Sequence, residues 1–268
     1  MFYMPAIYAH DTFGKLVSEQ LTGELKKVVS SYYDQFRIGL QGPDPLFYHR
    51  PYLPDKATKE GSHIHRQLCS NFLKTAIPII RREGIDSGEY AYLLGFICHF
   101  TLDSECHPYI DEYIKERKVG HIELESEFEK FMMRKDKIDP IITDISNYIP
   151  TDVYTAKCMA PFYENLDEKK AHKTLKEMHF EKHFLFAPKP IKQKVMNTIF
   201  HLSGHYDDIG GLMLQPKDNK ECVDSNEYLY ERFFQSIPIA IELLYSLNDT
   251  IQNGTPLNTR FHRDFETL

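Results

Sequence analysis

Three side chains that bind metals recur at intervals of four in the stretch GFICHFTLDSECHPYI, residues 95–110. They are His99, Asp103 and His107. On an α-helix, residues four apart lie about 40° apart around the axis and ~6 Å apart along it, so the three form one stripe facing a common partner. Imidazole and carboxylate are ligands that zinc accepts. A second pair with the same spacing, His121 and Glu125, follows in the next stretch of the chain.

A histidine on an apolar helical face is commonly a core residue whose ring bonds a backbone carbonyl. The chain has 13 His, so some pairs four residues apart arise by chance. Three aligned groups and a second pair would, however, bury several charges side by side, and without a cation that costs several kcal/mol. We therefore predict a metal site. Cys106 offers a further ligand, although packing is its simpler role.

The overall composition is that of a soluble globular protein, with 268 residues, 42% hydrophobic and 26% charged. The net charge of −7 argues against a basic surface for nucleic acid. The five cysteines lack CxxC spacing, which is typical of reduced thiols. The opening MFYMPAIYAH lacks leader features, and no stretch is apolar for the ~20 residues of a membrane span. We expect a cytoplasmic protein, with peripheral membrane contact and oligomeric state left open.

Apolar residues follow helical periodicity almost throughout, and alternation typical of strands is nearly absent. We therefore expect an all-α, multi-helix single domain over residues 1–268. The chain around LQGPDPLFYHRPYLP, residues 40–54, should form a loop. Residues from Gly254 onward should form a tail or a strap over the surface. Helices are expected at about 12–36 in one or two pieces, 61–82 with a bend at Pro78, 121–135, 140–148, 166–179, 190–207 and 225–248. A further helix, capped by Ser87, should end in the region 106–108 or continue to 115.

Several motifs resemble the zinc-dependent phospholipase C family. They are GFICHFTLDSECHPYI, GHIELESEFE, YAHDTFGKLV, QGPDPLFY and GSHIHRQ, which cover roughly the first half of the chain in the family's order. The resemblance implies an all-α zinc enzyme of the phospholipase C type, with metal ligands within residues 1–135 and a helical shell and tail over 136–268. Of the family's members, this chain is more similar to a shorter, intracellular branch than to the secreted enzymes.

The resemblance also implies a ligand set. One zinc would be held by Asp44, His65, His99 and Asp103, a second by His107, His121 and Glu125, and a third by His10 with Asp103. His63 and His65 lie about 200° apart on a helix, so only one can face the metal, and local similarity favours His65. Secreted members complete the third site with the amino group of an N-terminal Trp. This chain has no Trp, which leaves two or three ions open.

The activity that the resemblance implies is hydrolysis of a phosphodiester by metal-bound hydroxide, with Asp44 as both ligand and catalytic base. The substrate would be a phosphodiester or a phospholipid head group. Two alternatives remain: a zinc nuclease of the single-strand-specific type, and a non-catalytic, zinc-stabilised helical binding protein. The His10–Asp11 pair also suggests a His-Asp phosphohydrolase, but Asp11 is better interpreted as a helix cap. Further candidates around the site are Tyr32, Tyr33, Phe47, Tyr48 and Tyr52 as an aromatic wall, and His63, Glu105 and residues 205–211 as polar neighbours.

Overall fold

The computed structural model describes residues 6–49, 55–117, 119–204, 206 and 210–266. It is 76% helical, and within these residues it contains no strand, so the all-α prediction is confirmed. The α-helices are α1 Ile7–Gln20, α2 Gly23–Ser31, α3 Tyr33–Gly39, α4 Lys56–Arg66, α5 Cys69–Glu83, α6 Gly88–Glu116, α7 His121–Lys135, α8 Val153–Met159, α9 Glu168–Leu185, α10 Pro190–Leu202 and α12 Val223–Asn253. Short 3-10 helices are η1 Asp44–Tyr48, η2 Ile145–Tyr148, η3 Ala160–Phe162, η4 Gly210–Leu212, η5 Lys220–Cys222 and η6 Thr259–His262.

Helix α6 is the centre of the fold because it is apolar on every side along its first half. Residues 90–103 are buried without interruption. Ser87 caps the helix by accepting a hydrogen bond from the Tyr90 amide at 3.2 Å, as expected from the sequence. Helix α3 crosses α6 at a point where Gly39 faces Gly95, and a Cβ on either residue would overlap the backbone of the other helix.

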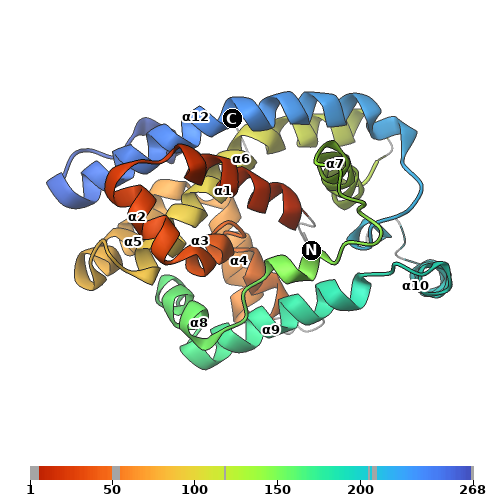
Figure 1. The fold of residues 1–268 in the computed structure, drawn as a ribbon, viewed down its shortest axis with the longest axis horizontal. Coiled ribbons are helices and arrows are strands. Elements are labelled where there is room, and N and C mark those ends of the chain that lie inside the picture. Colours follow the sequence, from red (N-terminus) through yellow and green to blue (C-terminus); the bar gives the residue numbers. More distant parts are fainter. Residues whose placement is uncertain (1–5, 50–54, 118, 205, 207–209, 267–268) are drawn as a thin grey trace.

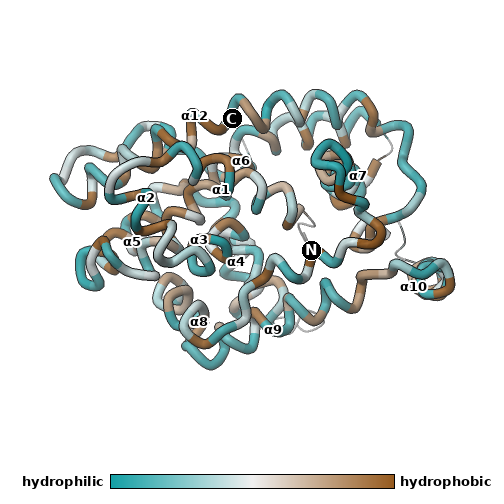
Figure 2. The backbone as a smooth tube through the Cα atoms, in the orientation of Figure 1, coloured by the Kyte–Doolittle hydropathy of each residue, from teal (hydrophilic) through white to brown (hydrophobic). Residues whose placement is uncertain are grey.

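In the described part of the chain, seven other helices pack against α6, namely α1, α2, α3, α5, α7, α8 and α12. Helix α12 packs on α6, α1 and α7, and it forms one long side of the molecule, while α9 and α10 form the opposite side (Figure 1). Along α12, hydrophobic and hydrophilic residues both recur within each turn, as expected of a helix with one buried face (Figure 2). No described helix combines the length and the apolarity that a membrane crossing requires.

Several expected helix boundaries are wrong. The single helix expected at 61–82 is two helices, because the chain between them is tied to the C-terminal segment: the Cys69 amide donates to the Arg263 carbonyl at 2.8 Å. The first helix begins at Ile7, not Thr12, so Asp11 lies inside it and pairs with Arg37 at 2.5 Å; it caps nothing. Helix α8, capped by Asp152, was not expected, and the helix expected at 140–148 is reduced to η2.

The segment after Gly254 lies across the molecule as a strap. Phe261 and Phe265 are buried, and Arg260 and Arg263 both bind Glu105, at 2.7 and 3.2 Å. These contacts bring the strap to α4 and α6, the helices that carry half of the predicted metal ligands.

Candidate metal centre

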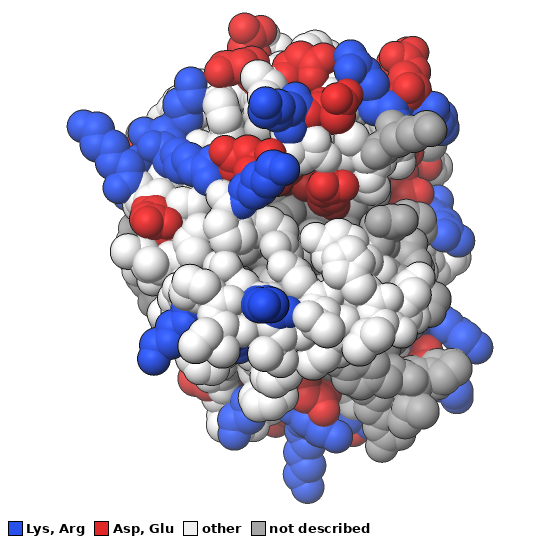
Figure 3. All heavy atoms as spheres, turned by 90° about the vertical axis from the view of Figure 1, so that its right-hand side faces the viewer, with Lys and Arg blue, Asp and Glu red and all other residues white. Residues whose placement is uncertain are grey.

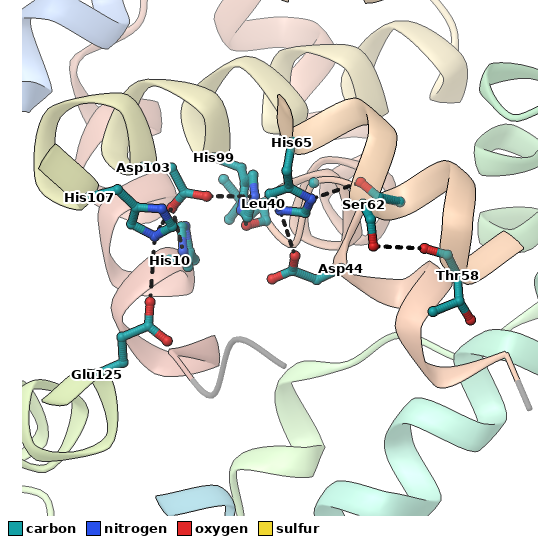
Figure 4. Close-up of polar contacts among 12 residues, drawn as sticks. His10, Leu40, Asp44, Thr58, Ser62, His65, His99, Asp103, His107 and Glu125 are labelled. Atoms are coloured by element: carbon teal, nitrogen blue, oxygen red, sulfur yellow. Dashed lines mark hydrogen bonds and ion pairs between the residues drawn. The ribbon is translucent and has the colours of Figure 1, made fainter. Parts of the chain in front are cut away.

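All eight predicted ligands meet in one place. Helix α1 contributes one, η1 one, α4 one, α6 three along its buried stripe, and α7 two. Figure 4 shows seven of them directed into the same space. Seven are buried and His121 is partly buried; in chain order they are His10, Asp44, His65, His99, Asp103, His107, His121 and Glu125.

Asp103 lies at the middle of this cluster. Its carboxylate oxygens lie 3.1 Å from His99 Nε2, 3.3 Å from His10 Nε2 and 4.0 Å from His107 Nε2. The stripe inferred from the four-residue spacing on α6 is therefore real. A carboxylate with imidazoles on both oxygens can bridge two cations.

The cluster continues in both directions from Asp103. On one side, His65 Nε2 lies 3.1 Å from Asp44 Oδ1. On the other, Glu125 Oε1 lies 3.5 Å from His107 Nε2 and 3.0 Å from His121 Nε2. The donor atoms fall into three groups within which all lie 4.8 Å or less apart: His10, His99, Asp103; Asp44, His65, His99; and His107, His121, Glu125.

The chemistry of these atoms fits a metal. Several approach one another closely yet form no hydrogen bond within the described part of the chain, although each is buried. They include Asp44 Oδ1, His65 Nε2, His99 Nε2, Asp103 Oδ2, His107 Nε2 and Glu125 Oε2. Burying so many imidazole and carboxylate atoms that have only one another as partners costs free energy unless a further group binds them. A divalent cation at each group would satisfy nitrogen and oxygen together.

The other ring nitrogen of two histidines is held by backbone carbonyls. His65 Nδ1 lies 2.9 Å from the Gly61 oxygen, and His99 Nδ1 lies 3.2 Å from the Leu40 oxygen. An Nδ1–H that donates to a carbonyl fixes the tautomer and leaves Nε2 bare for a metal. Phe265 packs against both rings, with centroids 5.2 Å from His65 and 5.9 Å from His99, and shields them with apolar surface.

The charges of the cluster depend on one another. Burial raises the pKa of Asp103, but His99, His107 and His10 outweigh it and hold that pKa well below its usual range. Glu125 follows the same pattern: burial is opposed by His121 and His107, which lower its pKa to about 2. Burial works against protonation of His121, but Glu125 raises its pKa to about 9. In the absence of a cation, imidazolium groups therefore balance the carboxylates.

The loop before η1 places Asp44 opposite α6. Gly42 has a φ of +50°, and a Cβ at this position would overlap the His99 ring. The Gly42 carbonyl accepts hydrogen bonds from the hydroxyls of Tyr92 at 3.3 Å and Tyr163 at 3.1 Å. The glycine and the two tyrosines thus fix the turn that brings Asp44 to His65 and His99.

A pocket with a cavity volume of about 90 Å³ opens beside the cluster. The ligand candidates His65, His107 and His121 line it. The pocket therefore borders both the group that contains His65 and the group that contains His107 and His121. The remaining walls are Phe47, Ser62, Arg66, Asp111 and Glu266. A small phosphate ester entering here would meet the cluster directly.

Other residues singled out in the sequence have different positions. His63 is exposed, and His65 is the one of the two that faces the cluster. Cys106 is buried and free but belongs to none of the three groups. Of the aromatic candidates, Phe47 stacks on His65 at 5.5 Å, whereas Tyr32 bonds Asp86 away from the cluster. Tyr52 and most of 205–211 lie outside the described residues.

Two charged residues near the cluster were missed from the sequence. Glu129 is buried on α7; its Oε1 accepts the Tyr8 amide at 2.6 Å, and its Oε2 has no hydrogen bond among described residues. Burial raises the pKa of Glu129 to about 7. Lys182 on α9 is also buried, its Nζ 5.9 Å from the Tyr48 ring centroid. Burial lowers its pKa despite the nearby Glu129 and Asp44 carboxylates.

Comparison with known proteins places this geometry in a family. No curated protein and no solved structure matches the chain. The family described as zinc dependent phospholipase C matches residues 9–185, which include every residue of the three groups. Its members depend on zinc, and nitrogen and oxygen donors of the kind gathered here suit that metal. The match spans well over half of the chain, which therefore belongs to the zinc-dependent phospholipase C family.

Proposed function

We propose that this protein hydrolyses a phosphodiester in a zinc-dependent reaction of the phospholipase C type. One observation supports this most directly: side chains from five separate elements, spread between residues 10 and 125, converge into one buried cluster of metal ligands that borders a pocket. A core assembled for packing alone would not gather so many buried imidazole and carboxylate groups.

The proposed ligand assignment is the one that the family resemblance implies, and each of its three sets shares at least two residues with one of the groups. Asp44, His65, His99 and Asp103 would hold one zinc ion, His107, His121 and Glu125 a second, and His10 with Asp103 a third. Zinc bound there supplies Lewis acidity toward phosphoryl oxygens and lowers the pKa of a coordinated water from near 16 toward ~7. Two ions would outweigh the charge of the three carboxylates. The cluster then attracts a phosphate although the protein as a whole is acidic.

Asp44 is proposed as the base that orients and deprotonates the attacking water. Its carboxylate is buried and faces His65 (Figure 4), with Oδ1 3.1 Å from His65 Nε2, so it lies among the metal ligands where it can accept a proton from a bound water. Arg66 lines the same pocket and can bind a phosphate oxygen at its entrance. The aromatic face of Phe47 forms an apolar wall of the pocket.

An open site favours catalysis over a purely structural role for zinc. A structural site has four protein ligands and no vacancy, whereas a catalytic one keeps a position for water or substrate. The His107, His121 and Glu125 group offers three donors, and two of these residues line the pocket. Zinc there would be reachable by substrate.

The test combines metal analysis with two assays, one on phosphatidylcholine and one on the soluble chromogen p-nitrophenyl phosphorylcholine. We expect two or three zinc ions per chain, hydrolysis of at least one ester, loss of activity on chelation and recovery with zinc. Bound zinc with no turnover of either ester would contradict the proposal and support the structural alternative. Cleavage of single-stranded DNA instead would support the nuclease.

The role of Asp44 has its own test. Asp44→Asn should keep an amide oxygen near the metal but lose the base, so we expect kcat to fall by ~10²-fold or more while bound zinc is retained. His63→Gln is the control, because that exposed residue lies outside the cluster. Full turnover of Asp44→Asn with full zinc content would remove the base from the mechanism.

We also propose a cytoplasmic location. Its support is that all five cysteines are free and buried, as expected for a protein kept in a reducing compartment. Fractionation of cells that express the native protein would test it, and recovery outside the cytoplasm would contradict it.

A further inference from the structure

Helix α10 carries apolar side chains on two opposite faces. Its inner face, with Met196 and Phe200, packs into a small cluster separate from the main core. Its outer face carries four large aliphatic residues at spacings of four, four and three, which align them in one stripe along the helix. All are at least half exposed, and Ile191 at 79% and Leu202 at 83% are the most exposed large apolar residues described; the stripe is Ile191, Val195, Ile199 and Leu202.

The stripe continues onto the end of α9. Phe180 and Phe184 are more than half exposed and stack on each other with ring centroids 6.2 Å apart. Lys192 of α10 lies over the Phe184 ring, its Nζ 5.6 Å from the centroid, so this aromatic pair adjoins the start of α10. We call the six residues Phe180, Phe184, Ile191, Val195, Ile199 and Leu202 the α10 surface.

The charge along α10 and the linker before it has one sign. Residues 182–206 contain Lys182, Lys189, Lys192 and Lys194 but no Asp or Glu, in a chain whose net charge is −7. Of these lysines, Lys189 and Lys194 are exposed beside the stripe. Figure 3, which faces the α10 end of the molecule, shows a broad uncharged area with basic side chains in and beside it, and most acidic side chains lie above it.

We propose that the α10 surface docks on an anionic lipid surface, with the stripe inserted among the head groups and the lysines on lipid phosphates. Helices with an exposed apolar face and lysines beside it lie in the plane of a membrane interface and bind anionic lipid most strongly. A second copy of the chain fits less well. A two-fold contact would set these lysines against one another with no carboxylate from the segment to pair them. The inference rests partly on the proposed function, which supplies a phospholipid as substrate.

Because the chain lacks tryptophan, insertion can be followed with a single introduced indole. Leu202→Trp should show a blue shift and quenching by brominated lipid on addition of phosphatidylcholine–phosphatidylglycerol vesicles. Val153→Trp is the control, since Val153 is 62% exposed on α8, at the other end of the molecule (Figure 1). A Leu202→Trp spectrum that vesicles leave unchanged would overturn the proposal.

Vesicle flotation tests the two parts of the surface separately. Ile191→Ser with Leu202→Ser should weaken binding by about ten-fold or more, since both side chains would leave the interface. Lys189→Gln with Lys194→Gln should weaken binding to anionic vesicles only. Lys74→Gln with Lys157→Gln, the same charge change on α5 and α8, should leave binding unchanged. Binding unaffected by the serine pair, or a dimer that the pair dissociates without any vesicle binding, would overturn the proposal.

Docking and catalysis fail in different ways. The serine pair should hydrolyse the soluble chromogen at the wild-type rate but lose activity on vesicles. Vesicle binding without cleavage of either ester would leave the docking surface standing and remove the proposed function. If the wild-type protein cleaves the chromogen but does not bind vesicles, the proposed function stands and the docking surface is contradicted.

Discussion

His63 and His65 are two residues apart on α4, yet only His65 faces the cluster. His65 Nε2 lies 3.1 Å from Asp44, whereas His63 is exposed. We expect His65→Ala to lower zinc content and to reduce hydrolysis by ~10-fold or more, because the group of Asp44, His65 and His99 loses one of its nitrogen donors. His63→Ala is the matched control and should change neither. Zinc analysis and the chromogen assay check both variants, and equal behaviour of the two would contradict the assignment.

Glu129 makes stability depend on pH. Its pKa rises from 4.5 when unfolded to about 7 in the fold, chiefly because the carboxyl is buried. At pH values between these two pKa values, Glu129 is protonated in the folded protein and ionised in the unfolded chain. The free energy of unfolding that this residue contributes therefore falls as pH rises from 4.5 to 7. Glu129→Gln does not titrate and keeps an oxygen for the Tyr8 amide.

We compare the free energy of unfolding of Glu129→Gln with that of the wild type. The difference, variant minus wild type, should increase as pH rises, and at pH 8 it should exceed its value at pH 4.5 by up to about 3 kcal/mol. Urea unfolding in the presence of a chelator measures this difference without a contribution from zinc. A difference between variant and wild type that stays constant with pH would show that the carboxyl does not titrate in this range.

The spacing of residues on one helix was enough to predict His99, Asp103 and His107. Nothing in their local sequence links Asp44 or His65 to them, and only the family resemblance joined those residues to the set. Glu129 was missed although it continues the four-residue spacing of His121 and Glu125 on α7. For Lys182 no sequence signal exists, because α9 reaches the cluster only through tertiary packing.

Among the elements, the turn before η1 is the most restrictive. Gly42→Ala would place a Cβ against the His99 ring as well as strain a backbone with positive φ. We expect a clear loss of stability and weaker zinc binding. Gly23→Ala is the matched control: its φ is +62°, but a Cβ there meets nothing within 4 Å. It should cost only about 1 kcal/mol and leave zinc affinity unchanged. Thermal unfolding and zinc titration of both variants would show whether the overlap with His99 matters.

The helical content was predictable because apolar periodicity is a local property. The break between α4 and α5 was not, since the chain at Gln67 and Leu68 contains no glycine or proline. It is set by residues nearly two hundred positions later, through the Cys69–Arg263 backbone bond and the bond from the Phe265 amide to the His65 carbonyl at 3.2 Å. Contacts of that range leave no periodic signal in the sequence.

At the scale of the whole molecule, the strap joins the C-terminal segment to the cluster. Phe265 is buried among His65, His99, Phe96 and Phe100. Phe265→Ala should lower the free energy of unfolding by about 3–5 kcal/mol, as expected for a large core truncation. Zinc should also dissociate faster, because water reaches the histidines. Phe180→Ala, at an exposed position, should change stability by less than about 0.5 kcal/mol. Denaturant unfolding and zinc release to a chromogenic chelator test both.

The position of Phe265 also matters during translation. At ~5–20 residues per second, on the order of ten seconds or more separates the synthesis of His65 from that of Phe265. Through that interval the imidazoles emerge from the ribosome without their aromatic cover, so any divalent ion in the surroundings can reach them. We therefore expect an ion bound in that interval to be enclosed once the strap is made, and to exchange slowly with other ions afterwards.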